Sequence, residues 1–208
     1  MVILSKGEET KKRILQAAIE IFKSQGINWT SFQLLADRVG ISQPALYKYF
    51  ANKDALLLDC CLEVVKRGQA FIDAGIDVNA PAIDRLRSYV LGNIRWAMEK
   101  PREADLVFAM YSNGSYSTDF KKLHLKIDLG GIKRIETHSI HIFHENKKMQ
   151  IKKLKIEKCA RIIHSLLVGE VLKALRWPNE SSALIRTKYI MESIEQILKS
   201  TEASLDLG

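Results

Sequence analysis

Hydrophobic residues recur along most of the chain at the spacing of an α-helix. In the first such segment, Ile14 is followed by apolar residues at i+4, i+7 and i+8, which places all of them on one helix face. The same spacing, read together with cap residues and helix breakers, predicts helices over residues 8–25, from Thr30 or Ser31 to near 39, after Ser42, from Asn52 to about 75, and over 82–100, 103–111, 119–144, 151–176 and 181–200. The sequence shows no strand-like alternation and no internal repeat. It therefore predicts an all-α fold with about nine helices.

Glycines mark the ends and the weak points of these predicted helices. Gly26 and Gly40 follow the first two helices at the position where a chain commonly leaves a helix. Gly130 and Gly131 stand inside the 119–144 segment, where we expect a kink or a break because glycine destabilises a helix interior. The closely spaced short helices at the start of the chain predict a small helix-turn-helix domain over residues 1–52 and a larger helical domain over residues 53–208.

Composition favours a folded protein inside the cell. Hydrophobic residues make up 47% of the 208 residues, too many for a disordered chain, and 4 Pro and 11 Gly are too few for a linker-rich or turn-dense all-β protein. The sequence has no run of about 18 apolar residues, which is the length that a membrane-spanning helix needs. The apolar opening Met1-Val2-Ile3-Leu4 is far shorter than the hydrophobic part of a secretory signal. We therefore expect a soluble, cytoplasmic protein.

The cysteines fit a reducing compartment. Cys60 and Cys61 are adjacent, Cys159 is distant, and no C-x-x-C pair or zinc-ligand spacing appears. We expect buried, reduced thiols. A redox-sensing role for Cys60 or Cys61 is the alternative.

The net charge of +8 suggests a nucleic-acid partner, but the distribution of the charge complicates that interpretation. Residues 1–50 hold seven Lys/Arg against four acids, a net +3, whereas residues 121–158 hold eleven against four, a net +7. The most basic stretch thus lies in the middle of the chain. A solvated surface is the ordinary explanation for it, and an anionic effector or a secondary DNA contact is the alternative.

Residues 31–53, SFQLLADRVGISQPALYKYFANK, have the pattern of a helix-turn-helix. Ala36 is small where two helices must cross closely, and Gly40 permits the sharp turn between them. Ile41, Leu46 and Phe50 supply apolar anchors behind the second helix. In DNA-binding proteins this second helix lies in the major groove and contacts base edges with its N-terminal residues.

The residues left for the outer face of the second helix have the chemistry of base and phosphate contacts. Gln43 can pair through two hydrogen bonds with adenine, which is worth about 1–3 kcal/mol against a wrong base. Pro44 and Ala45 offer apolar contact to a thymine methyl group. Phosphate contacts are expected from Tyr47, Lys48, Lys53 and the N-terminus of the helix that begins at Ser31.

The sequence resembles the TetR (tetracycline repressor) family of bacterial transcriptional regulators. The similarity begins at residues 10–18, TKKRILQAA, and runs through Phe22, Gly26 and the helix-turn-helix to residues 46–57, LYKYFANKDALL. Beyond residue 60 nothing identifies a subfamily. Ser31 stands where the family often has Thr, and Ala51 stands where Pro is frequent; neither change removes a needed function.

The resemblance implies which residues contact DNA. It places the base-reading positions on Gln33, Gln43, Pro44, Ala45 and Tyr47, and the phosphate-contacting positions on Ser31, Lys48, Tyr49 and Lys53. We include Ser42, which starts the second helix, in the same expected interface. The alternative is a helix-turn-helix that never touches DNA, because Ala36, Leu46 and Phe50 would be core residues in either case.

The resemblance also implies an effector-binding and dimerisation domain after the helix-turn-helix. The last two predicted helices carry broad apolar faces, and two such helices from each subunit would form a four-helix bundle, which would let a homodimer bind a palindromic operator. The expected dimer contacts are Ile163, Leu167, Val171, Ile190, Ile194 and Ile197. The expected contacts of a small-molecule effector are Trp96, Phe108, Tyr111, Leu129 and His138. For both sets the alternative is packing within the core of one chain.

The sequence contains neither the G-x-S-x-G motif of hydrolases nor the H-E-x-x-H motif of metalloproteases. It also lacks the G-x-x-x-x-G-K motif of a phosphate-binding loop. His138, His141 and His144 spread over about 120° of a predicted helix, which is wide for a metal site. We therefore expect a repressor that a small molecule releases from operator DNA, with no catalytic residues, no metal site and no cofactor. The alternatives are an activator, a regulator controlled without a small-molecule inducer, and a helical enzyme or carrier.

Overall fold

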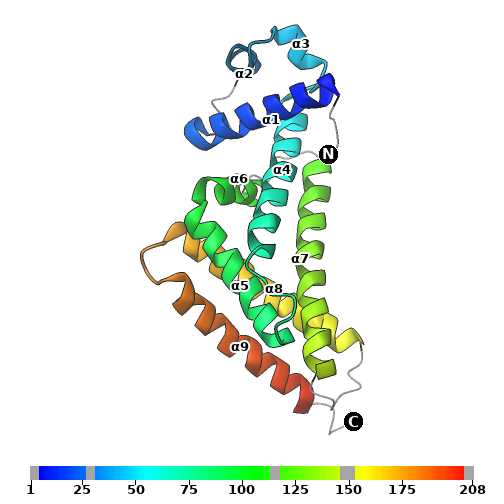
Figure 1. Ribbon diagram of the computed structural model, residues 1–208, viewed down its shortest axis with the longest axis vertical. Helices are drawn as coiled ribbons and strands as arrows, with labels where there is room; N and C mark the ends of the chain where they lie inside the picture. The colour runs from blue at the N-terminus through cyan, green and yellow to red at the C-terminus, as the bar shows by residue number, and fades with distance from the viewer. Residues whose placement is uncertain (1–4, 27–30, 113–117, 146–152, 204–208) are drawn as a thin grey trace. The chain divides into compact units, whose positions relative to one another are not determined.

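The computed structural model describes residues 5–26, 31–112, 118–145 and 153–203, and within these ranges it contains helices and no strand. In chain order the helices are α1 (Lys6–Gln25), α2 (Phe32–Val39), α3 (Gln43–Tyr47), α4 (Lys53–Asp73), α5 (Ala82–Glu99), α6 (Pro101–Ser112), α7 (Thr118–Glu145), α8 (Lys153–Arg176) and α9 (Ala183–Ala203) (Figure 1). The all-α prediction is confirmed. None of these helices combines the length and the apolar composition that crossing a membrane requires.

Side-chain caps explain where the first helices begin. Ser31 accepts a hydrogen bond from the backbone N–H of Leu34 at 3.1 Å, and Ser42 accepts one from the backbone N–H of Ala45 at 3.3 Å. Asn52 caps α4 in the same way, through its Oδ1 atom. These three predicted caps are confirmed, and each satisfies a backbone donor that has no partner inside its helix.

Helix α7 corrects one expectation, because it runs without a break through Gly130 and Gly131. A Cβ atom added at Gly131 would lie 2.5 Å from Nε2 of His164 in α8, whereas one added at Gly130 would meet nothing within 4 Å. Gly131 therefore permits close packing between α7 and α8. Buried Ile135 and Ile142 on the same helix add packing that outweighs the weak helix propensity of the two glycines.

The chain divides into two compact units. The first unit comprises residues 1–67 and 105–123, and the second unit comprises residues 68–104 and 124–208. Helices α4, α6 and α7 each contribute residues to both. The domain boundary predicted between residues 52 and 53 stays a prediction.

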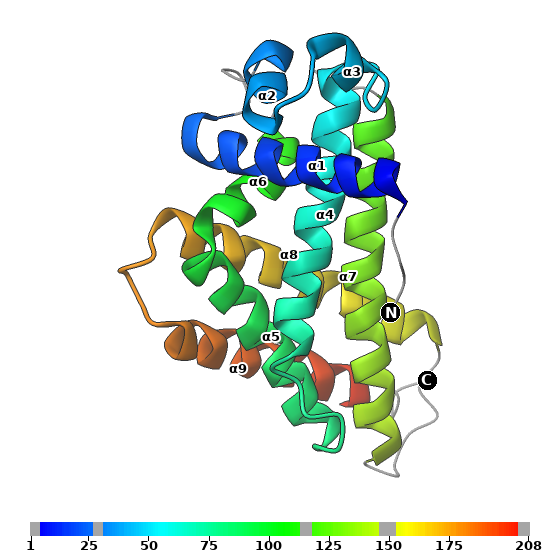
Figure 2. The ribbon, with the colours of Figure 1, turned by 45° about the horizontal axis from the view of Figure 1, so that its top comes forward.

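The core of the first unit lies where α1 meets α2 and α4. Ile14, Leu35 and Leu56, one from each of these helices, are fully buried. Polar contacts add to this packing: Arg13 donates to the backbone oxygen of Val39 at 2.8 Å. Lys11 forms an ion pair with Asp59 at 2.7 Å. Helix α1, which is nearly as long as α4, thus packs against both α2 and the first half of α4 (Figure 2).

In the second unit, α4 and α5 approach closely through two reciprocal contacts. A Cβ atom added at Gly68 would lie 2.9 Å from the indole ring of Trp96, and one added at Gly92 would lie 3.1 Å from the side chain of Ile72. Each helix therefore contributes one glycine and one large side chain, four residues apart. Helices α8 and α9 pack against α5 and against each other, with fully buried Ile163 and Ile194 in this part of the core.

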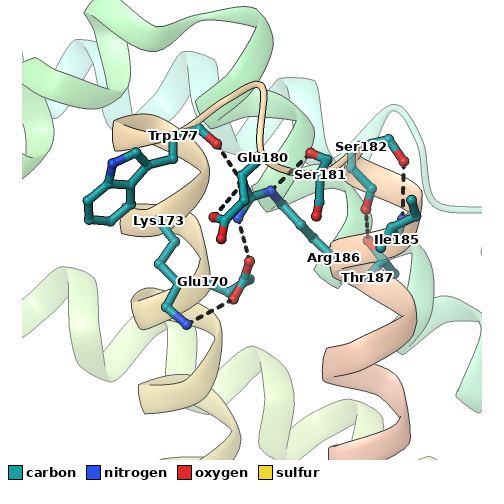
Figure 3. Close-up of polar contacts among 10 residues, drawn as sticks. Glu170, Lys173, Trp177, Glu180, Ser181, Ser182, Ile185, Arg186 and Thr187 are labelled. Atoms are coloured by element: carbon teal, nitrogen blue, oxygen red, sulfur yellow. Dashed lines mark hydrogen bonds and ion pairs between the residues drawn. The ribbon is translucent and has the colours of Figure 1, made fainter.

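A buried arginine joins α8 to α9. The Arg186 side chain donates to Glu170 at 2.7 Å, to the backbone oxygen of Trp177 at 2.6 Å and to the backbone oxygen of Ser181 at 3.1 Å (Figure 3). The residue is only 2% exposed. It therefore satisfies two carbonyls of the segment that connects α8 to α9 and joins that segment to Glu170 of α8.

Candidate nucleic-acid interface

Helices α2 and α3 are joined by a sharp turn at Gly40. Gly40 has φ 74° and ψ 40°, in the left-handed region that glycine adopts without the penalty of a side chain. The backbone N–H groups of Gly40 and Ile41 both donate to the backbone oxygen of Ala36. Two residues later Ser42 caps α3, and Pro44 occupies the first turn of that helix. The predicted helix-turn-helix is present in the structure.

Buried residues determine which side of this motif faces solvent. Leu35 and Ala36 in α2, Leu46 in α3 and Phe50 beyond it are at most 2% exposed, and Ile41 is half-buried. The anchoring role predicted for Leu46 and Phe50 is confirmed. Because these side chains occupy the inner face, the remaining residues of α3 must face outward.

All residues expected to contact DNA remain accessible. Gln43, Ala45, Tyr49 and Lys53 are half-buried, and the others are exposed: Ser31, Gln33, Ser42, Pro44, Tyr47 and Lys48. They lie on α2, on α3 and at the start of α4, within the first unit. The structure thus gathers them on neighbouring elements. Their contacts with DNA stay a prediction.

Several of the polar side chains already have partners in the free protein, among them Gln33 and the hydroxyls of Ser31 and Ser42. Gln33 donates from Nε2 to Oδ1 of Asp37 at 2.7 Å, one turn further along α2. The hydroxyl of Ser42 is used as the cap of α3. Gln33 must therefore leave Asp37, or share its amide, before it can contact a base edge.

A hollow of about 270 Å³ lies beside α3. Its lining residues are Phe32, Gln43, Tyr47, Ala51, Asn52 and Lys53. Three of them belong to the expected interface, whereas Phe32 and Asn52 were not singled out from the sequence. From the sequence, Phe32 is recognisable only as the residue that follows the cap Ser31, and Asn52 only as a helix cap; neither feature points to DNA.

The residues expected to contact an effector are placed on three helices. Trp96 lies on α5 and is buried, and its Nε1 atom has no hydrogen-bond partner among the residues that the structure describes. His138 and Leu129 lie on α7; His138 is half-buried with an unpartnered Nδ1 atom, and Leu129 is 45% exposed. Phe108 belongs to the first unit and the other three to the second. The side chain of Tyr111 lies outside the described residues.

Positive charge surrounds His138. Its ring lies 5.9 Å from the ring of Tyr89, over which the Arg134 guanidinium is placed. Burial lowers the pKa of His138, and the charges of Arg85 and Arg134 lower it further. His138 is therefore neutral near pH 7, and its unpartnered Nδ1 can serve as donor or acceptor according to the tautomer.

The residues expected at the dimer contact are mostly buried within the single chain, and their contact with a partner stays a prediction. Ile163, Leu167, Val171, Ile190 and Ile194 are at most 6% exposed within the single chain, and Ile197 is half-buried. Burial of these side chains fits the alternative of packing within the core of one chain. The same two helices expose other large hydrophobic side chains, namely Ile162, Leu166, Leu184, Ile185 and Tyr189.

Some of the basic side chains in residues 121–158 form ion pairs with acidic residues. Lys122 pairs with Asp119, Lys133 pairs with Glu136 at 3.1 Å, and Arg134 pairs with Asp73 of α4. Residues 146–152, which include Lys147, Lys148 and Lys152, lie outside the described residues. His144 is one of the residues whose side chain is not described. Among the side chains that are described, no three His, Cys, Asp or Glu residues are placed to hold a metal ion.

Comparison with known proteins gives matches in the N-terminal part of the sequence. Residues 14–60 match the family described as bacterial regulatory proteins, tetR family. An uncharacterized HTH-type transcriptional regulator, YerO of Bacillus subtilis, is 42% identical over 53 residues, which are 26% of this chain and 18% of that protein. The class A tetracycline repressor protein from transposon 1721 of Escherichia coli is 35% identical over 83 residues, 39% of this chain and 35% of that protein. The chain therefore spans about a fifth to a third of the length of these relatives.

Comparison with solved structures extends the likeness of the fold to nearly the whole chain. A TetR transcription regulator from Haloarcula marismortui superimposes with a TM-score of 0.74 at 16% identity, covering 93% of this chain and 98% of that one. A transcriptional regulator from Rhodococcus sp. RHA1 gives a TM-score of 0.73 at 16% identity, covering 91% and 96%. Residues 14–60 thus match the tetR family of bacterial regulatory proteins, and nearly the whole chain shares the fold of these solved regulators.

Proposed function

We propose that the protein is a transcriptional regulator that binds a palindromic DNA operator as a homodimer and that a small-molecule effector releases it. The observation that carries the proposal is the helix-turn-helix of the first unit, in which Leu46 and Phe50 are buried while Gln43, Tyr47 and Lys48 remain accessible. An amide, a phenol and an ammonium group match the acceptors and donors of base edges and phosphates.

The homodimer is supported by hydrophobic side chains that the single chain leaves uncovered. Ile162 and Leu166 are 51% and 41% exposed and stand one turn apart on α8; Ile185 and Tyr189 are 45% and 60% exposed and stand one turn apart on α9. Large exposed apolar faces of this kind mark interaction surfaces. Two helices from each subunit would form a four-helix bundle and present two recognition helices to successive major grooves.

The effector is supported by unpartnered polar atoms inside the second unit. Within the described part of the chain, Trp96 Nε1, His138 Nδ1 and Ser139 Oγ are buried without a hydrogen-bond partner. Buried polar atoms usually have partners, so a water or a ligand is the expected occupant of such positions. An effector that favours one dimer conformation by about 1–3 kcal/mol would lower operator affinity by about 5- to 150-fold.

Selection of bound sequences from a randomised duplex pool tests the proposal. We expect the full-length protein to enrich a sequence with twofold symmetry and to bind it as a dimer. Compounds are then screened for release of the enriched duplex, with a scrambled duplex of equal length as the control. The absence of any enriched sequence would contradict DNA-binding regulation; enrichment without a releasing compound would contradict only the effector.

A further inference from the structure

Phe32 is the first residue of α2 and the only aromatic residue on that helix. It is 8% exposed, whereas Gln33 and Leu34 beside it are exposed. The cap that Ser31 forms with the backbone N–H of Leu34 fixes the first turn of α2 and with it the direction of the Phe32 side chain. Phe32 has no polar group in its side chain, and because it is buried it offers DNA little surface of its own.

Tyr47 is the last residue of α3 and is 50% exposed. The centroid of its ring lies 4.9 Å from that of Phe32, with the two ring planes tilted by 45°. Aromatic rings attract each other at such separations. The two residues also line the same hollow beside α3, together with Gln43 and Lys53. Tyr47 thus packs against a buried ring and keeps half of its surface accessible.

We infer that Phe32 is a positioning residue for DNA recognition: its buried ring holds the Tyr47 ring in place at the side of the recognition helix. A half-exposed tyrosine without such a support would sample several rotamers, and binding would have to restrict them. With the support, Tyr47 meets the duplex already ordered, and the wall of the hollow next to Gln43 keeps its shape. This inference rests on the proposed function, because it gives Tyr47 a contact with DNA.

A double-mutant cycle tests the inference. Phe32→Leu removes the aromatic ring but keeps an apolar side chain of similar bulk, and Tyr47→Ala removes the side chain on which Phe32 would act. From the usual strength of an aromatic pair, we expect Phe32→Leu to weaken binding of the selected operator about 2- to 12-fold in the wild-type background. In the Tyr47→Ala background we expect less than about a twofold effect, since the two residues act as one unit.

A matched control separates positioning from general loss of packing. Phe22 of α1 is 4% exposed in the same unit, so Phe22→Leu makes the same substitution at a different buried site. We expect Phe22→Leu to lower thermal stability and to leave operator affinity within about twofold in both backgrounds. Equal losses of affinity from Phe32→Leu in the two backgrounds would overturn the inference, because they would show that Phe32 acts independently of Tyr47.

Spectra of the DNA-free protein give a readout that does not depend on binding. With ¹³C-labelled tyrosine, the Tyr47 ring signals, assigned by their loss in Tyr47→Phe, should shift in Phe32→Leu and stay in place in Phe22→Leu. Unchanged Tyr47 signals in Phe32→Leu would overturn the inference. A wild-type protein that selects no DNA sequence would contradict the proposed function, whereas specific binding that Phe32→Leu leaves intact would contradict only the role of Phe32.

Discussion

Arg186 of α9 donates a hydrogen bond from Nη1 to Oε1 of Glu170 in α8 at 2.7 Å. The arginine side chain is 3% exposed and that of Glu170 is 20% exposed, so the pair is largely withdrawn from water. Further donation to the backbone oxygens of Trp177 and Ser181 leaves the guanidinium well satisfied (Figure 3). An ion pair in such a setting is costly to break, because its surviving partner stays buried.

We predict that Arg186→Ala lowers the free energy of unfolding by about 3–5 kcal/mol, because Glu170 loses its buried partner and the backbone oxygen of Trp177, just after α8, loses its donor. Urea denaturation followed by circular dichroism measures the change. Lys173→Ala is the control: Lys173 lies 3.9 Å from the same glutamate but its side chain is 62% exposed. An exposed pair of this kind contributes about 0–1 kcal/mol. Equal effects of the two substitutions would contradict the importance of burial.

The adjacent glycines of α7 should respond in opposite ways to alanine. Gly130→Ala meets nothing within 4 Å and should stabilise the protein by up to about 1 kcal/mol, the difference in helix propensity. Gly131→Ala places a Cβ atom 2.5 Å from His164 Nε2 and should destabilise it by about 1–3 kcal/mol, the usual cost of overpacking. Thermal unfolding of both variants checks this pair. Stabilisation by both would show that His164 moves aside freely.

Buried thiols should make Cys60 and Cys61 inert. Burial raises the pKa of Cys61 to about 12 and raises that of Cys60 further. At pH 8 both should resist iodoacetamide in the native protein and react once urea is added, as mass spectrometry would show. Rapid labelling of either cysteine in the native protein would contradict this prediction and would support the redox-sensing alternative.

The same pKa shifts predict a loss of stability in alkaline solution. In the unfolded protein a cysteine thiol ionises at about pH 8.5, whereas in the folded protein both thiols stay protonated to much higher pH. The unfolded state therefore binds fewer protons above that pH, and the free energy of unfolding falls as the pH rises from about 8.5 towards 12. Urea midpoints at increasing pH measure the slope, which should be shallower in a Cys60→Ala/Cys61→Ala variant. An unchanged slope would contradict the prediction.

The proposed dimer predicts that a charge at Leu166 separates the subunits. Leu166→Glu places a carboxylate in the exposed apolar face of α8, where a partner subunit would have to desolvate it. Sedimentation velocity at micromolar concentration should show a dimer for the wild type and a monomer for this variant. Leu125→Glu is the control, because Leu125 is 57% exposed on α7. A monomeric wild type would contradict the homodimer itself.

Base and phosphate contacts should differ in their dependence on sequence and salt. Gln43→Ala should weaken binding to the selected operator by about 1–3 kcal/mol and leave binding to random duplex nearly intact, because an amide distinguishes bases. Lys53→Ala should weaken binding to both and make the salt dependence shallower by about one phosphate contact. Band-shift titrations at several salt concentrations measure both effects. Equal losses on both duplexes for Gln43→Ala would remove it from the base-reading set.

The start of the chain was the part best predicted from sequence. Caps and turns are local: Ser31, Ser42 and Asn52 bind backbone groups three residues away, and Gly40 needs only its own backbone conformation. Periodicity also placed Leu46 and Phe50 in the core. Contacts that extend over so few residues can be inferred without knowing what else packs nearby.

Predictions for the second unit were less complete, because they depended on partners far away in the sequence. Apolar spacing identified α8 and α9 as helices with broad hydrophobic faces, but it left open whether Ile163 and Ile194 pack within one chain or against a partner; both are buried in their own chain. The broken helix expected at Gly130 and Gly131 is continuous because Gly131 packs against His164, a residue 33 positions away.

The sequence by itself determined that the fold is all-α and that it begins with a helix-turn-helix, because helix spacing, caps and the left-handed turn are properties of neighbouring residues. Tertiary structure alone decided which faces of α8 and α9 stay open, that Arg186 is buried against Glu170, and that the rings of Phe32 and Tyr47 lie in contact. These are relationships between helices. An apolar residue can be buried against its own chain or against another one, and only the packed structure shows which surface is left over.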